Sequence, residues 1–429
     1  MDNKDIANLN TEGKIEVFLR LPSIDNEESA DITREYISIL RLLRDGCAHS
    51  KDHQNAIAEH EELNNQLHQL VFAATATPEN VRLIALQLLA NATVQNTYTQ
   101  CMIWQRHGAE ILRNCSLSPL GKLTDVCLMI VYIALKGAAV PNIKQQALCA
   151  AVHVWQTMVQ NSSKVHMEML HFLFEYFIVH GENQPVPYYA SLTTAERITF
   201  LDYLKQYLVD NCPNGRIHEY MLKHITYEFT IKSDNILICK QDSAQFATTD
   251  PLLAHEVQSL LRVIAYATGT DEYGDSYANE HSLFLNVSSL LRLLAQVGKE
   301  SQNIFTPMNK LEEVALTSKI PRDFESEVSF EFKTLLVRCI ANLLYKNKTN
   351  QGYCIDTRLL PTLLECTNMD ARNPLLREWS ILAIRNACEG NRDVQELIAN
   401  MTNEGPAKND IMSELNLDMG SLRIKPNTK

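Results

Sequence analysis

The sequence predicts an all-α protein built as a solenoid of repeated helical units. Asn373 suits a helix cap and Pro374 suits a first helical turn, and Gly390 ends the run. Between them, apolar residues recur at helical spacing: Ile381, Ile384 and Cys388. The stretch Asn373–Ile398 therefore reads as one helix, a stop and the start of another.

One spacing occurs at four places in the sequence. Counting from Asn386, mostly apolar residues lie five and two positions before it and two and twelve after it, with a glutamine nine after it. These offsets repeat from Asp45, Asn91 and Asn342, and the glutamines are Gln54, Gln100, Gln351 and Gln395. Only 20 glutamines occur in 429 residues, so the coincidence indicates a repeat. The origins lie 46 and 44 residues apart, which is the period of armadillo and HEAT units, and stacking such units covers their apolar faces.

Composition fits a cytosolic or nucleocytoplasmic protein. The net charge is -12 without a basic cluster, which argues against nucleic-acid binding. The N-terminus lacks the pattern of a secretory signal, and the longest apolar run, Val126–Leu135, is too short to span a bilayer. The 11 cysteines show no Cys-x-x-Cys spacing and are expected to be reduced and buried.

The N-terminal part, residues 1–180, is expected to hold helical repeats. Residues 1–30 form a leading cap, followed by repeats at Asp31–Phe72 and Thr77–Ile111, the second starting with a Thr-Pro-Glu cap. Further helices are expected at Leu123–Lys136, Pro141–Gln160 and Val165–Val179.

Residues 181–250 are expected to form an irregular helical connecting region. The stretch 184–189 contains two prolines and is predicted to be extended, which makes it the best candidate for a break in the array. Helices are expected at Thr194–Leu208 and Arg216–Phe229, and Thr230–Asp250 has no assignment.

The C-terminal repeats are expected at 251–401, followed by a tail at 402–429. An acidic stretch, 270–276, lacks the alternation of a calcium-binding loop and is expected to be a solvated loop. Helices are expected at Leu283–Val297, Asn309–Leu316 and Phe330–Tyr345. The apolar residues of the tail suggest either a segment that folds back over the last unit or a short partner-binding motif.

The block 330–398 resembles the ataxin-10 family. The resemblance rests on Asn373-Pro374, Arg377-Glu378-Trp379 and Ala383-Ile384-Arg385-Asn386, on Cys388-Glu389-Gly390-Asn391, and on Leu343 to Lys348 with Asn350-Gln351. It implies an armadillo-like, noncatalytic adaptor tied to cytokinesis, neuronal survival and neurite outgrowth, without a cofactor. It further implies O-GlcNAc transferase and G-protein β subunits as partners, homo-oligomerisation, and a cytoplasmic, perinuclear or midbody location.

Partner-binding candidates come from the repeat itself. Asn91, Asn342 and Asn386 resemble the asparagine ladder with which armadillo proteins bind extended peptides, although Asp45 replaces one member. The alternative is that each amide bonds a local carbonyl or caps a turn. Trp379 and Arg377 are candidate anchors for a partner, and half-buried packing is the other interpretation of Trp379.

The sequence contains no catalytic or metal-binding motif. Cys47, His49 and His53 lie close together, but at the expected end of a helix, where polar residues are normal. Three hypotheses follow: a noncatalytic scaffold, a peptide or cargo carrier using the asparagine ladder, and an enzyme with an unfamiliar site around Cys47 or His53.

Overall fold

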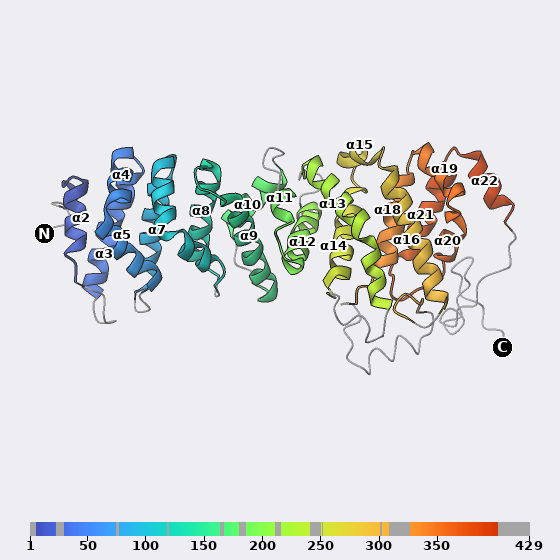
Figure 1. Cartoon of the computed structure of the whole chain (residues 1–429), viewed down its shortest axis with the longest axis horizontal. Coiled ribbons are helices and arrows are strands. Elements are labelled where there is room, and N and C mark those ends of the chain that lie inside the picture. Colours follow the sequence, from blue (N-terminus) through green and yellow to red (C-terminus); the bar gives the residue numbers. More distant parts are fainter. Residues whose placement is uncertain are drawn as a thin grey trace, which may run out of the picture. The chain divides into compact units, whose positions relative to one another are not determined.

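The structure is a computed structural model that describes residues 6–22, 30–73, 77–117, 120–163, 167–179, 186–210, 216–240, 250, 252–300, 303–308 and 327–401. Within these ranges the chain is all helical and has no strand (Figure 1). It divides into two compact units, Met1–Thr199 and Phe200–Lys429. The division falls inside helix α12, within the stretch 181–250. The expected boundaries at 180, 250 and 401 stay predictions.

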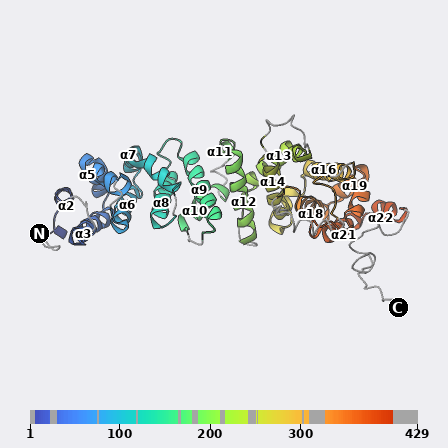
Figure 2. The same ribbon diagram turned by 90° about the horizontal axis from the view of Figure 1, so that it is seen from below.

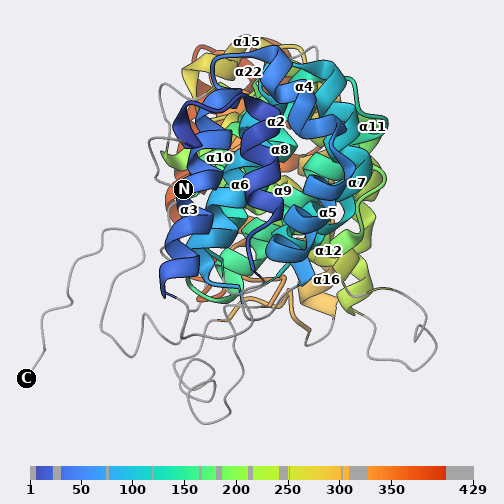
Figure 3. The ribbon, with the colours of Figure 1, turned by 90° about the vertical axis from the view of Figure 1, so that its left-hand side faces the viewer.

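The helices of the first unit are α2 (Thr11–Leu19), α3 (Ala30–Cys47), α4 (Lys51–Glu59), α5 (Glu61–His68), the π-turn η1 (Gln69–Ala73), α6 (Glu79–Thr93), α7 (Thr97–Cys115), α8 (Lys122–Gly137), α9 (Ile143–Gln160), α10 (Glu168–Ile178), α11 (Val186–Tyr189) and the start of α12 (Thr194–Asp210). Here α6 packs on α3, α8 on α6 and α10 on α8, which makes one layer. Helices α5, α7 and α9 lie on the other side (Figures 2 and 3). This two-layer stacking is that of a helical-repeat solenoid.

The second unit continues with the rest of α12, then α13 (Glu219–Lys232), η3 (Ser233–Lys240), α14 (Leu252–Ala267), η5 (Asp271–Tyr273), α15 (Gly274–Tyr277), α16 (His281–Glu300), α18 (Phe332–Leu344), α19 (Lys348–Asp356), α20 (Leu359–Glu365), α21 (Leu376–Cys388) and α22 (Arg392–Ala399). Helix α18 packs on α14 and α21 packs on α18. Figure 2 shows these three helices along one side and α13, α16 and α19 along the other. The all-α, armadillo-like solenoid expected from the repeat is confirmed.

The start of α21 differs from the expectation. The helix begins at Leu376, and its cap residue Leu375 has a φ of 61°. Asn373 does not cap α21, because its Oδ1 accepts a hydrogen bond of 2.9 Å from the backbone N of Lys333 in the first turn of α18. The backbone N–H groups in the first turn of α18 have no partner within that helix, and one of them donates to Asn373. Asn373 therefore caps α18, which belongs to the preceding repeat.

The buried face of α21 also differs from the expected stripe. Ile381 is 51% exposed, and Ile384 and Cys388 are only half-buried. The residues of α21 that are buried are Leu376, Ser380, Ala383, Asn386 and Ala387. Apart from Leu376, the buried face of α21 is thus made of small or polar residues, and Ile381, Ile384 and Cys388 lie outside it.

Residues 186–189 are helical rather than extended, because Pro187 falls in the first turn of α11, where no N–H donor is needed. The unassigned stretch contains the end of α13 and the 3-10 turn η3, and the acidic stretch forms η5 and the start of α15. The expected helix Asn309–Leu316 and the tail 402–429 lie outside the described residues. Of the helices that the structure describes, none is long and apolar enough to cross a membrane.

Candidate functional site

The four residues from which the repeat was counted, Asp45, Asn91, Asn342 and Asn386, are called the origin residues. Asn386 Nδ2 donates a hydrogen bond of 2.9 Å to the carbonyl oxygen of Ala341, the residue before the preceding origin. Asn91 Nδ2 makes the equivalent bond of 3.3 Å to the carbonyl oxygen of Arg44. Both amides therefore bridge consecutive units.

Asn342 follows the same rule with a different acceptor. Its Nδ2 donates to the Oγ1 of Thr268 at 3.2 Å. The next residue, Gly269, approaches so closely that a Cβ there would lie 3.0 Å from the same Nδ2. Thr268 and Gly269 thus occupy the place that Ala341 and Asn342 occupy in the following unit. The repeat extends to the end of α14, where the sequence shows no asparagine to mark it.

The repeat glutamines bind carbonyl groups at the ends of two helices. Gln351 Nε2 lies 2.8 Å from the carbonyl oxygen of Asn386, 3.3 Å from that of Glu389 and 3.4 Å from that of Leu344. In the compact unit Met1–Thr199, Gln54 Nε2 contacts three carbonyls in the same relative positions: Cys47 at 3.1 Å, Asn91 at 3.0 Å and Val94 at 3.1 Å. Carbonyls at a helix C-terminus lack intrahelical donors, so this amide satisfies its own unit and the next one.

A third repeated position was missed from the sequence. Five residues after each origin, a side chain caps the following helix by accepting from the backbone N three residues on. The capping residues are Ser50, Asn96, Asn347 and Asn391. A search of the same frame for Ser and Asn, the preferred capping residues, would have found them.

Asn342 and Asn386 line a groove of about 790 Å³ at the ends of α14, α18 and α21, here called the asparagine groove. Its charged side chains are Asp271, Asp275, Lys346, Arg385 and Glu389. Its rim includes Tyr345, which is 53% exposed. The groove thus contains side chains of both charges, an exposed aromatic ring and two side-chain amides that each donate one hydrogen bond.

A second hollow of about 390 Å³, here called the tryptophan cleft, is lined by α12, the C-terminal half of α14 and the starts of α18 and α21. Trp379 is half-buried there, and the guanidinium of Arg338 lies 5.1 Å from its ring centre and 4.1 Å from that of Tyr266. Lys205 adds a second cation, 5.7 Å from Tyr266. The stacking fixes Arg338 between two aromatic faces. Arg377 is half-buried but does not line this cleft.

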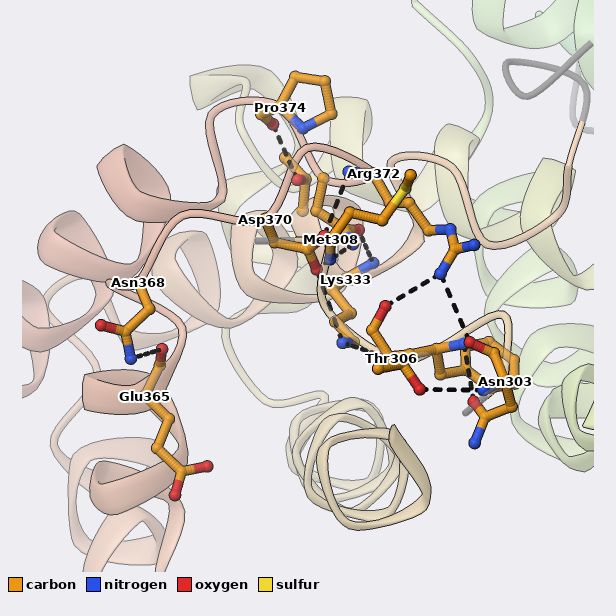
Figure 4. Close-up of polar contacts among 12 residues, drawn as sticks. Asn303, Thr306, Met308, Lys333, Glu365, Asn368, Asp370, Arg372 and Pro374 are labelled. Atoms are coloured by element: carbon orange, nitrogen blue, oxygen red, sulfur yellow. Dashed lines mark hydrogen bonds and ion pairs between the residues drawn. The ribbon is translucent and has the colours of Figure 1, made fainter. Parts of the chain in front are cut away.

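A buried ionic cluster joins the start of α18 to the loop before α21 (Figure 4). Lys333 Nζ donates to the carbonyl oxygen of Phe305 at 2.7 Å and lies 3.7 Å from Asp370 Oδ2. Asp370 also accepts from the backbone N of Met308 and of Arg372, each at 3.1 Å. Burial lowers the pKa of Lys333, and the carboxylate of Asp370 opposes that shift. The cluster satisfies its charges internally, so its role is to hold α18 and the loop before α21 together.

Cys47 and His53 do not form a reactive pair. Burial raises the pKa of the Cys47 thiol to about 12, so it is protonated at neutral pH. His53 is buried with its Nδ1 2.8 Å from Thr11 Oγ1, whereas His49 is exposed. Across the described part of the chain, no group of three or more His, Cys, Asp or Glu side chains could hold a metal ion.

Comparison with known proteins then identifies the relatives of this chain. The "Spinocerebellar ataxia type 10 protein domain" matches residues 332–423. Ataxin-10 of Bos taurus is 26% identical over 414 residues, covering 94% of this chain and 84% of that protein. Ataxin-10 of Homo sapiens is 24% identical over the same shares. These matches, which extend over 94% of this chain, support the ataxin-10 family.

The region matched by the family model begins at the first residue of α18, so it includes α18 and α21, which help to line both hollows. An "Ataxin-10 homolog" of Dictyostelium discoideum is 39% identical over 89 residues, which is 21% of this chain and 15% of that protein. The family and the armadillo-like fold favour a non-enzymatic repeat scaffold.

Among solved structures, an engineered protein matches 90% of this chain and 93% of its own with 14% identity and a TM-score of 0.34. A designed armadillo repeat protein matches 87% and 99% with 10% identity and a TM-score of 0.21. These superpositions are too poor to argue from. The helix packing and the repeated hydrogen bonds described above define the fold of this chain.

Proposed function

We propose that this protein is a noncatalytic scaffold that binds partner proteins on the surface formed by α14, α18 and α21. The observation that carries the proposal is the tryptophan cleft, in which Trp379 and Tyr266 flank Arg338 beside an open hollow. Tryptophan, tyrosine and arginine are the residues most often responsible for binding energy at protein interfaces. Here they are already held in place by stacking, so little side-chain freedom is lost when a partner binds.

The form of the partner follows from the two hollows. Along α18 and α21, the tryptophan cleft lies near the helix starts and the asparagine groove at the helix ends, and both hollows adjoin the end of α14. A segment of extended chain running along these helices would place one side chain in the tryptophan cleft and later ones in the asparagine groove. The proposed ligand is therefore an extended segment of a partner protein with an acidic residue at the Arg338 end.

The family resemblance extends the proposal to particular partners and processes. O-GlcNAc transferase and G-protein β subunits are the proposed partners, and cytokinesis, neuronal survival and neurite outgrowth the proposed processes. A cytoplasmic location, with perinuclear and midbody pools, and self-association complete this proposal. Nothing in the charge of the chain favours nucleic acid as a partner.

A peptide or cargo carrier that uses the asparagine ladder is the alternative. Asn342 and Asn386 line the asparagine groove, which favours it. Against it, Asn386 is 5% exposed and its amide N–H is used by Ala341. Replacing Asn342 with alanine tests this alternative, since the side chain of Asn342 bonds only a hydroxyl. An unchanged affinity for the bound segment would remove it.

The main test is affinity purification with the full chain carrying Arg338→Ala or Trp379→Ala. We expect each substitution to weaken the affinity for partners of the natural chain at least tenfold, which corresponds to about 1.4 kcal/mol of binding free energy. Recovery of these partners should fall accordingly. Tyr227→Ala is the matched control, because Tyr227 is 61% exposed on α13 and lines neither hollow. Thermal unfolding separates lost binding from lost folding. Partners that bind all three variants equally would refute the proposed site.

A further inference from the structure

The last repeat differs from the others in one consistent way. At the position five before the origin, Leu40 is 0%, Leu86 2% and Val337 0% exposed, whereas Ile381 is 51% exposed. The same change holds at the other repeat positions that are buried earlier in the chain. In the last unit, Ile384, Cys388 and Ile398 are half-buried and Gln395 is exposed.

The physical reason is the missing successor. Helices α3, α6 and α18 are each followed by another helix that packs on them, namely α6, α8 and α21. The positions buried in those three helices are thus the ones that face the next unit. Among the described residues, no helix follows α21 in this way. The side chains Ile381, Ile384, Cys388, Gln395 and Ile398 are here called the terminal face.

The hydrogen bonds of the Gln395 side chain indicate which group would fit the terminal face. Its Nε2 donates 2.8 Å to the carbonyl oxygen of Cys388, which is the bond to its own unit. Gln351 makes the same bond and also contacts Asn386 and Glu389 of the next unit. Gln395 thus retains a second amide hydrogen for a carbonyl that a neighbour would bring. An apolar helix with a free C-terminal carbonyl fits this face.

We propose that residues 411–424 of the same chain cover the terminal face. Apolar residues recur there at intervals of three and four, as on one side of a helix: Ile411, Leu415, Met419 and Leu422. The family match spans residues 332–423, so one domain includes the last two repeats and residues 411–423 of this segment. The connection 402–410 has nine residues and can extend to about 30 Å, more than twice the roughly 12 Å length of α22.

The natural thiol of Cys388 reports whether the face is covered. The experiment is alkylation of the full-length protein with N-ethylmaleimide, followed by mass spectrometry of the peptide that contains Cys388. We expect the double substitution Leu415→Asp with Met419→Asp to raise the alkylation rate at Cys388 about tenfold, because a segment docked nine-tenths of the time protects to that extent. Cys149, half-buried in the first unit, is the internal reference and should not change.

The controls make each outcome decisive. Asn416→Asp adds one charge outside the apolar series and should leave the rate at Cys388 unchanged. An equal rate in the natural chain and the double variant would overturn the proposal. Protection that disappears on dilution would also overturn it, since a second copy of the chain would then be the occupant. Protection that is independent of concentration and lost only in the double variant supports it.

Discussion

The pair of repeats in the first compact unit and the pair at the end of the second have the same set of repeated hydrogen-bonding residues, here called the polar frame. The two pairs differ in the polar groups that are buried beside this frame. Both pairs use a bridging asparagine, a glutamine that binds helix-end carbonyls and a capping residue at the same offsets. Behind this frame, the N-terminal pair buries neutral histidines, with His107 1% exposed. The C-terminal pair buries the Lys333–Asp370 ion pair. The difference teaches that the frame sets the stacking of units, while the groups behind it set how stability responds to charge and pH.

The largest expected effect is the loss of the buried carboxylate. Asp370→Ala should destabilise the C-terminal pair by about 3–5 kcal/mol, because the buried Lys333 would lose the carboxylate that balances its charge. Urea unfolding followed by Trp379, in a chain whose other two tryptophans are phenylalanine, measures this. Glu365→Ala, which removes only the exposed pair with Lys299, should cost less than about 1 kcal/mol. Equal effects of the two variants would contradict the structural role of the cluster.

Acid should weaken the N-terminal pair selectively. Burial, with smaller contributions from His68 and Arg106, lowers the pKa of His107 from 6.5 to about 4. Between those values the unfolded chain binds a proton that the folded chain does not, so stability falls as the pH falls from 6.5 to 4. The loss amounts to at most about 3 kcal/mol.

Fluorescence of Trp104 on α7, in a chain without the other two tryptophans, measures this loss by urea unfolding at pH 7 and pH 4.5. His107→Gln keeps a donor for Asn64 Oδ1, which lies 3.1 Å from His107 Nε2, but it cannot titrate. The variant should flatten the pH dependence of this region. An undiminished slope in the variant would assign the effect to other groups.

The repeat glutamines should differ by position. Gln351→Ala leaves three helix-end carbonyls without their donor and should cost about 2–3 kcal/mol. Gln395→Ala, made together with Leu415→Asp and Met419→Asp so that the terminal face is uncovered, removes one exposed hydrogen bond and should cost less than about 1 kcal/mol. The comparison uses urea midpoints at constant m-value. Equal costs would show that the bridge between units is not what the glutamine supplies.

The smallest expected effect tests whether the shared frame is equivalent in the two pairs. Ser50→Ala and Asn391→Ala each remove a helix cap and should each cost about 1 kcal/mol. Ser50→Thr and Asn391→Asp keep an acceptor oxygen and should retain most of the stability. If removal of the cap lowered the free energy of unfolding in only one pair, the polar frame would contribute differently to stability in the two compact units.

The sequence by itself determined the fold class and the period, and it showed the resemblance to the ataxin-10 family. The offsets from Asn386 predicted repeating units because stacked units need the same side chain at the same place, and the glutamines mark a bond that each unit must make. The sequence contains no catalytic or metal-binding motif, which favoured a scaffold. The bounds of most helices followed from capping and apolar spacing.

Only the tertiary structure decided which neighbour each polar group serves. Asn373 reads as a cap for its own helix but caps α18, because local sequence cannot show that a neighbouring helix start lies beside it. Ile381 reads as core but is exposed, because burial at that position depends on a following unit. The tryptophan cleft was equally invisible, since Tyr266, Arg338 and Trp379 lie on three helices far apart in the chain.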